Sequence, residues 1–298
     1  MFNLFLILIW FLQYFLVILR LNLTIIQRQL FSIVIRIYSI LVFCLLLCIG
    51  CQWQLRPQDA SAEHASVSIQ RYDRIESLYL TTGDYSAMQQ MNVNFPMQTR
   101  MLIEDVLKLG KVNDADINTK FLYFFQDSTL QAMLSAVQQQ YGEMDDVSDA
   151  LNSAFTHLQE QLPDIEIPLV YTQIGSFDQS IIVGYNTLGI SLDKYLGADY
   201  PFYVDHYSDE QRRMMVREMI VPDCLSFYLL SLYPLPARQS SQYERDVHMG
   251  RIQWVVNHLL GRSVFDNDIV AAIDRLMNGA DAPSLDRLLR GAGDAVAD

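Results

Sequence analysis

The chain has 298 residues, a formal net charge of −13 and 51% hydrophobic residues. Residues 1–51 contain three arginines and no acidic residue, so the remainder carries 18 basic and 34 acidic residues, a formal charge of −16. Such an acidic body repels nucleic acids and anionic lipid surfaces, which excludes functions that depend on binding a phosphate backbone. The body holds only Cys224, so it forms no intrachain disulfide and depends on its hydrophobic core.

The chain begins with two apolar stretches. Residues 2–19 are nearly long enough to span a bilayer, and Arg36 precedes the second stretch, residues 37–50. A basic residue followed by a short apolar run and a small residue is typical of a secretory signal. The end of this run, Ile49-Gly50-Cys51, resembles a bacterial lipoprotein signal, in which the mature chain begins at a lipid-modified cysteine. We therefore interpret residues 1–51 as a hydrophobic leader and predict lipidation of Cys51.

Three cysteines at the end of this leader suggest another reading. Cys44, Cys48 and Cys51 have the spacing C-x3-C-x2-C, which can hold an iron–sulfur cluster. A cluster needs thiolates with polar support, which an apolar leader lacks, so we expect no metal here. Residues 1–29 make the leader unusually long, and they are either an extra membrane helix or the result of a misplaced start. Residues 52–66 are polar and predict a tether.

The body is predicted to form one domain, residues 67–290, followed by a flexible tail, residues 291–298. Its N-terminal part is predicted to contain a short strand and then helices. The strand is residues 67–73, and the helices lie between Pro96 and Gln161. The next segments are short and rich in β-branched residues, so they predict two or three strands, within 167–176, 179–186 and 187–197.

The C-terminal part is predicted to be mostly helical. Residues 197–210 are aromatic and acidic and predict a loop, after which Asp209 is expected to cap a helix over 209–221 that ends by Pro222. Further helices are expected over 224–234 and 241–261. The pattern predicts an α+β, mainly helical domain with one small sheet.

Several motifs resemble the GldB family of gliding-motility lipoproteins. An R-F-D-like triplet occurs near the expected mature start, an I-x-L-D-x-Y-L-G core precedes a P-F-Y-like loop, and I-V-P-D follows. The matching residues are Arg71, Tyr72, Asp73, Ile190, Leu192, Asp193, Tyr195, Leu196, Gly197, Pro201, Tyr203 and Asp223. Asp193, Tyr195 and Gly197 either end a strand and turn the chain, or line a former cleft. The resemblance covers residues 67 to about 235.

That family is similar to zincin metallopeptidases, in which a helix bearing H-E-x-x-H lies beneath a small sheet. The corresponding segment here is Arg217-Glu218-Met219-Ile220-Val221. Arginine stays protonated and valine has no lone pair, so the two ligand positions cannot bind zinc, although Glu218 is present. The resemblance thus implies a zincin-like scaffold without the catalytic metal, and we expect no cofactor.

The resemblance implies an envelope protein that is anchored to a membrane, faces the periplasm and contacts other envelope or motility proteins. Two alternatives stay open. One is a peptidase with an atypical site around Glu218, His206 and His248, although His248 lies on an apolar stripe and is expected to be a satisfied core histidine. The other is a glycan-binding or other ligand-binding lipoprotein that uses the aromatic segment 200–207.

Overall fold

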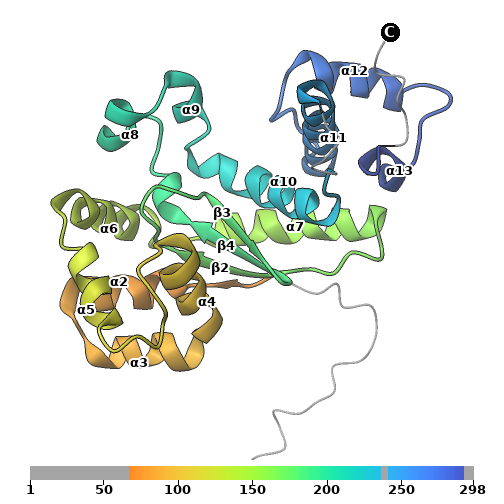
Figure 1. The fold of residues 1–298 in the computed structure, drawn as a ribbon. Coiled ribbons are helices and arrows are strands. Elements are labelled where there is room, and N and C mark those ends of the chain that lie inside the picture. The colour runs from red at the N-terminus through yellow and green to blue at the C-terminus, as the bar shows by residue number, and fades with distance from the viewer. Residues whose placement is uncertain (1–66, 236–240, 292–298) are drawn as a thin grey trace, which may run out of the picture. The chain divides into compact units, whose positions relative to one another are not determined.

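The structure is a computed structural model, and it describes residues 67–235 and 241–291. These residues belong to one compact unit in which helices surround a small sheet (Figure 1). The α+β, mainly helical class is confirmed. Cys51, the tether 52–66 and nearly all of the tail 291–298 lie outside the described residues. Within the described ranges, no helix has both the length and the apolar character needed to cross a membrane.

The sheet has four strands and mixes parallel and antiparallel pairs. Its strands follow the order β1-β2-β4-β3, with β1, β2 and β4 parallel and β3 antiparallel to β4. Val170 of β2 pairs with Ile69 on one side and with Leu188 on the other. The strands are β1 (Ile69–Gln70), β2 (Leu169–Gln173), β3 (Ile181–Gly184) and β4 (Thr187–Ser191).

Two or three strands were expected between residues 167 and 197, and three are present. The strand expected over 67–73 is shorter than predicted, because a helix already begins at Tyr72. Gly189 in the middle of β4 has a packing reason: a Cβ there would lie 2.5 Å from the ring of Tyr171 on the neighbouring strand. Only glycine allows this close approach.

Helices occupy the chain between β1 and β2, as expected. Gly83 ends α2 in the left-handed conformation, Asp84 and Asp127 cap the next helices with their side chains, and Pro96 occupies a first helical turn. The elements in this part are α2 (Tyr72–Thr82), α3 (Tyr85–Asn94), α4 (Pro96–Arg100), the π-helical turn η2 (Met101–Val106), α5 (Ile117–Phe124), α6 (Ser128–Gln140) and α7 (Asp145–Gln161).

The part after the sheet is also helical. It contains η3 (Leu192–Lys194), α8 (Pro201–His206), α9 (Asp209–Arg213), η4 (Arg217–Met219), α10 (Ile220–Leu232), α11 (Gln242–Leu260), α12 (Asp268–Met277) and α13 (Leu285–Leu289).

Several predictions for this part were wrong. The segment 197–210 is not a loop throughout, because Pro201 opens α8. The single helix over 209–221 is interrupted: α9 stops at Arg213, and Val216 is extended before the chain becomes helical again at η4. The side chain that caps α9 belongs to Ser208, with Gln211 completing a capping box, and not to Asp209. Pro222 lies in the first turn of α10, where its missing N–H costs nothing.

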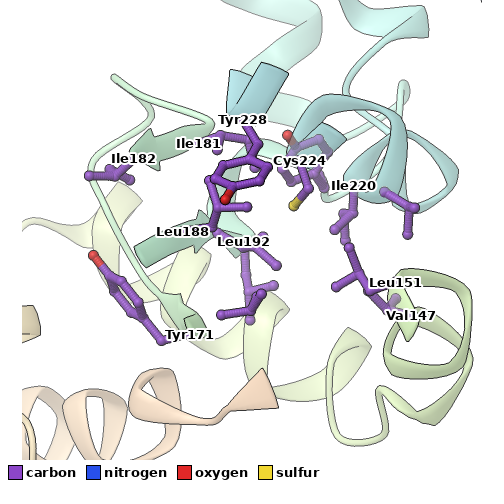
Figure 2. Close-up of a cluster of buried hydrophobic side chains, with 14 of the residues drawn as sticks. Val147, Leu151, Tyr171, Ile181, Ile182, Leu188, Leu192, Ile220, Cys224 and Tyr228 are labelled. Atoms are coloured by element: carbon purple, nitrogen blue, oxygen red, sulfur yellow. The ribbon is translucent and has the colours of Figure 1, made fainter. Parts of the chain in front are cut away.

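Helix α10 forms the centre of the core. It packs against β3 and β4 and against α7, with Ile220 and Cys224 fully buried. Figure 2 shows this cluster, in which Tyr228 of α10 lies beside Leu188 of β4, and Val147 and Leu151 of α7 lie on the side of Ile220. The segment Arg217–Val221, which opens α10, is therefore fixed between the sheet layer and α7.

Candidate functional site

The triplet Arg71-Tyr72-Asp73 joins the start of the domain to its interior. The Arg71 guanidinium donates to both carboxylate oxygens of Asp73, at 2.9 and 2.8 Å, and to the backbone carbonyl of Tyr141 at 2.6 Å. Asp73 is buried and also accepts from the hydroxyl of Thr172 in β2. The pair thus connects β1 and α2 to β2 and to the end of α6.

Asp193 organises the loop that follows β2. Its carboxylate is fully buried and accepts hydrogen bonds from the backbone N–H groups of Gly175, at 2.7 Å, and Phe177, at 2.8 Å. Burial raises the pKa of Asp193, and these two hydrogen bonds oppose the shift. Phe177 has a φ of 64°, a conformation that non-glycine residues rarely adopt. The carboxylate therefore stabilises a strained turn in the interior.

The rest of the D-x-Y-L-G motif extends this network. The hydroxyl of Tyr203 in α8 donates to the Asp193 carbonyl and accepts from the Leu196 N–H at 3.2 Å. Tyr195 donates to Asp223 at 2.8 Å. Burial raises the pKa of Asp223 to about 6, and the hydrogen bond from Tyr195 opposes that shift.

The smaller motif residues hold the backbone of the same region. Gly197 has a φ of 106° and donates its N–H to the carbonyl of Met215 at 3.0 Å, while Pro201 begins α8 and Ile190 is fully buried in β4. The structure thus brings the motif residues of β4, η3, α8 and α10 together, and Ile190, Asp193, Tyr195 and Tyr203 among them are buried.

A second candidate site is an open groove that is lined in part by the segment Arg217–Val221. The groove has a volume of about 430 Å³ and lies between α7, the start of α10 and the end of α11. Arg217, Glu218 and Val221 all contribute to its wall. The residues of the D-x-Y-L-G motif do not line it.

Arg217 is fully engaged with neighbouring groups. Its guanidinium binds both carboxylate oxygens of Asp146 in α7, at 2.9 and 2.7 Å, and the carbonyls of Gln140 and Glu143, at 3.2 and 2.7 Å. It also lies 4.9 Å from the ring centre of Tyr141. Hydrogen bonding to Asp146 raises the pKa of Arg217, and the same contact lowers the pKa of Asp146. Arg217 is therefore a paired cation, at the position where the resemblance to zincins would place a first metal ligand.

Comparison with known proteins identifies the family. A family model described as "Gliding motility protein GldB" matches residues 54–269. This chain belongs to the GldB family. No curated protein and no solved structure matches it. Membership supports an association with gliding motility and a location in the cell envelope.

Glu218, His206 and His248, the residues of the alternative atypical peptidase site, have different surroundings in this GldB-family protein. His206 is exposed on α8 and stacks on Phe202 with ring centres 4.1 Å apart. His248 is buried in α11, where burial lowers its pKa and the backbone of Tyr233 opposes that shift. Glu218 lies in the groove. Over residues 67–235 and 241–291, no group of three potential ligands is close enough to bind a metal ion.

The aromatic segment 200–207 packs largely against itself. Phe202 lies between the rings of Phe177 and His206, with 4.1 Å between ring centres on either side, and Tyr207 donates to the Phe177 carbonyl at 3.0 Å. Tyr203 is fully buried. These contacts occupy both faces of Phe202 and support the strained turn at Phe177.

Several site residues were missed by the sequence motifs. Glu76 is fully buried and accepts from the Ile174 N–H at 2.8 Å, and burial raises its pKa well above the ordinary value. Asp146 and Arg262 line the groove but belong to no recognisable pattern, because their partners lie far away in the sequence. An acidic residue in the first turn of a helix, such as Asp146, is usually explained by the helix dipole alone.

Proposed function

We propose that this GldB-family protein is a non-catalytic lipoprotein of the cell envelope. Acyl chains on Cys51 anchor it, its body faces the periplasm, and it acts by contacting other proteins of the motility apparatus or its linked secretion machinery. The family match supports the motility association, and it begins at residue 54, shortly after the proposed lipidation site. The polar residues 52–66 suit a tether between lipid and body.

The observation that carries the non-catalytic proposal is the state of Arg217. A peptidase derived from a zincin would place a neutral histidine there, with a second histidine at Val221. Arg217 is instead held by Asp146 and two carbonyls, and Val221 presents only hydrocarbon. We interpret the body as a degenerate zincin-like scaffold in which these contacts have replaced the metal.

Anchoring and motility are tested together by a pair of cysteine substitutions. In a gliding bacterium that depends on this protein, Cys51→Ser is expected to release the protein from the membrane fraction and to stop colony spreading. Cys48→Ser is the matched control, since it removes a thiol three positions earlier and is expected to leave both properties unchanged. A Cys51→Ser protein that stays in the membrane fraction and supports spreading would contradict lipid anchoring at this residue.

The absence of catalysis is tested on the purified full chain. We expect zinc well below one atom per chain and no chelator-sensitive cleavage of a peptide library. Stoichiometric zinc that is lost on changing His206 or His248 to alanine would overturn the proposal in favour of an atypical peptidase. Co-purification of the lipidated protein with envelope proteins then measures the proposed contacts directly.

A further inference from the structure

The groove beside Arg217 has an apolar floor and a polar rim. Its volume of about 430 Å³ lies near the lower end of the roughly 300–1,000 Å³ that ligand pockets usually have. Such a space accommodates a few residues in extended form and is too small for a helix. The floor consists of Val147, Ala154, Val221 and Leu259, and the rim includes Ser153, His157, Glu218 and Arg262.

Arg262 provides a cation that is free to bind a ligand. The only hydrogen bond of its guanidinium to the described part of the chain is a long one, 3.5 Å, to the carbonyl of Glu218, and no described carboxylate forms an ion pair with it. Arg217, which also lines the groove, is instead bound by Asp146 and two carbonyls. An exposed guanidinium that faces an open groove, in a protein of charge −13, is a recognition group for an anion.

His157 adds an oriented polar group to the same rim. Its Nδ1 lies 3.0 Å from the carbonyl of Leu259, and because a carbonyl only accepts, Nδ1 carries the hydrogen. This bond fixes the ring and leaves Nε2 of the neutral imidazole as an acceptor for an N–H group of a ligand. Ser153 lies one turn earlier on α7, so its hydroxyl is on the same face of the helix. The rim therefore offers a guanidinium, an oriented imidazole and a hydroxyl.

The charges nearby select the kind of anion. The carboxylates of Glu218 and Asp146 also line the groove, and they repel a phosphate dianion more strongly than a single carboxylate. The apolar floor favours a ligand with an aliphatic part. A peptide carboxyl terminus combines one negative charge with a hydrocarbon side chain, and capture of such termini is a known recognition mode.

We propose that this groove binds the carboxyl-terminal end of a partner protein chain. The terminal carboxylate lies on Arg262 and Ser153, the Nε2 of His157 accepts from a backbone N–H of the bound chain, and the last side chain, an aliphatic one, lies on the floor formed by Val147, Val221 and their neighbours. This proposal rests on the non-catalytic binding function proposed above. It adds that the partner presents a carboxyl terminus to the groove beside Arg217.

The test measures fluorescence anisotropy with the full-length protein in nanodiscs made of zwitterionic lipid. The probe is a fluorescein-labelled peptide, Gly-Ser-Gly-Ser-Ala-Val-Leu, with a free carboxyl terminus, and the comparison is the same peptide with a terminal amide. We expect the free acid to bind at least about tenfold more tightly than the amide, because a charged hydrogen-bonded pair is lost in the amide. Equal affinities, or no binding of the free acid, would overturn the proposal.

Substitutions locate the site. Arg262→Gln is expected to reduce binding of the free acid to the level of the amide, whereas Arg213→Gln, at an exposed arginine of α9 outside the groove, leaves binding unchanged. Ala150→Trp fills the groove and is expected to abolish binding, whereas Ala132→Trp, at an exposed alanine of α6 away from the groove, has no effect. Unfolding curves that match the wild type show that the variants fold. Arg262→Gln binding like the wild type would overturn the assignment.

Competition separates the possible sources of the anion. Sodium acetate is expected to displace the labelled peptide at lower concentration than inorganic phosphate at the same ionic strength. Stronger competition by phosphate would overturn the carboxylate assignment in favour of a phosphate or a lipid headgroup. These measurements use purified protein alone, so they can fail while the anchoring and zinc experiments succeed, and the reverse.

Discussion

Asp193 allows a quantitative test of the interior network. The substitution Asp193→Ala removes the acceptor of two backbone N–H groups, those of Gly175 and Phe177, in a place with no access to water. An unsatisfied buried donor costs about 1–3 kcal/mol, so the two together predict a loss of about 2–6 kcal/mol in the free energy of unfolding. The burial that raises the pKa of this carboxyl also means that its removal relieves a desolvation cost. We therefore expect the lower half of that range.

The assay is urea unfolding of the full chain in detergent, followed by circular dichroism and by tyrosine fluorescence. The matched control is Asp178→Ala, an exposed carboxylate next to the same turn, which is expected to change stability by less than about 0.5 kcal/mol. Asp193→Asn keeps one acceptor oxygen and is expected to fall between the two. If Asp193→Ala unfolds at the same urea concentration as Asp178→Ala, the network does not stabilise the turn and the reasoning is wrong.

Three further outcomes follow. Burial raises the pKa of Asp223 to about 6. Its ionisation in the folded protein therefore lowers the free energy of unfolding as pH rises from about 4 through 6. Asp223→Asn can still accept from Tyr195, and its free energy of unfolding relative to the wild type is expected to rise by up to about 3 kcal/mol over that range. Urea curves at pH 4, 5, 6 and 7 measure this, and parallel profiles would refute it. Gly189→Ala is expected to lose about 1–3 kcal/mol in thermal unfolding, because its methyl group collides with Tyr171. Gly175→Ala, whose methyl group meets only ordinary contacts of 3.5 Å, is expected to lose much less.

The sequence predicted most of the fold through local patterns. The β-branched residues of 169–191 identify β2, β3 and β4, and Pro96 marks a helix start, because these signals act within a few residues. Helix α8 was missed because aromatic residues such as Phe202 and Tyr203 have weak helix propensity, and the proline at its first position was not weighed against them.

The break before η4 could not be predicted in the same way. The apolar and charged residues of 209–221 follow a continuous helical period, yet the backbone opens at Val216. The carbonyl of Met215 accepts from the N–H of Gly197, a contact with a distant segment that overrides the local preference. Tertiary hydrogen bonds of this kind leave no periodic trace in the sequence.

The candidate site was also only partly predictable from the sequence. The motif residues Asp193 and Tyr195 were identified from the sequence, but their partners, the N–H groups of the loop after β2 and the carboxylate of Asp223, became visible only in the fold. Arg217 was singled out from the sequence because arginine has no lone pair for a metal. That it is neutralised by Asp146, 71 residues earlier, required the structure.

The position of β1 has a mechanical consequence. This strand is at the sheet edge, begins two residues after the first described residue, and runs parallel to β2, while Val67 exchanges two hydrogen bonds with the Asn152 side chain of α7. Tension applied at Val67 along the strand axis acts on the β1–β2 bonds and the Asn152 pair in shear, so these contacts share the force and do not break one after another. The N-terminal strand of the domain thus resists a pulling force, and the Arg71–Asp73 ion pair, which follows β1 in the chain, adds to this resistance.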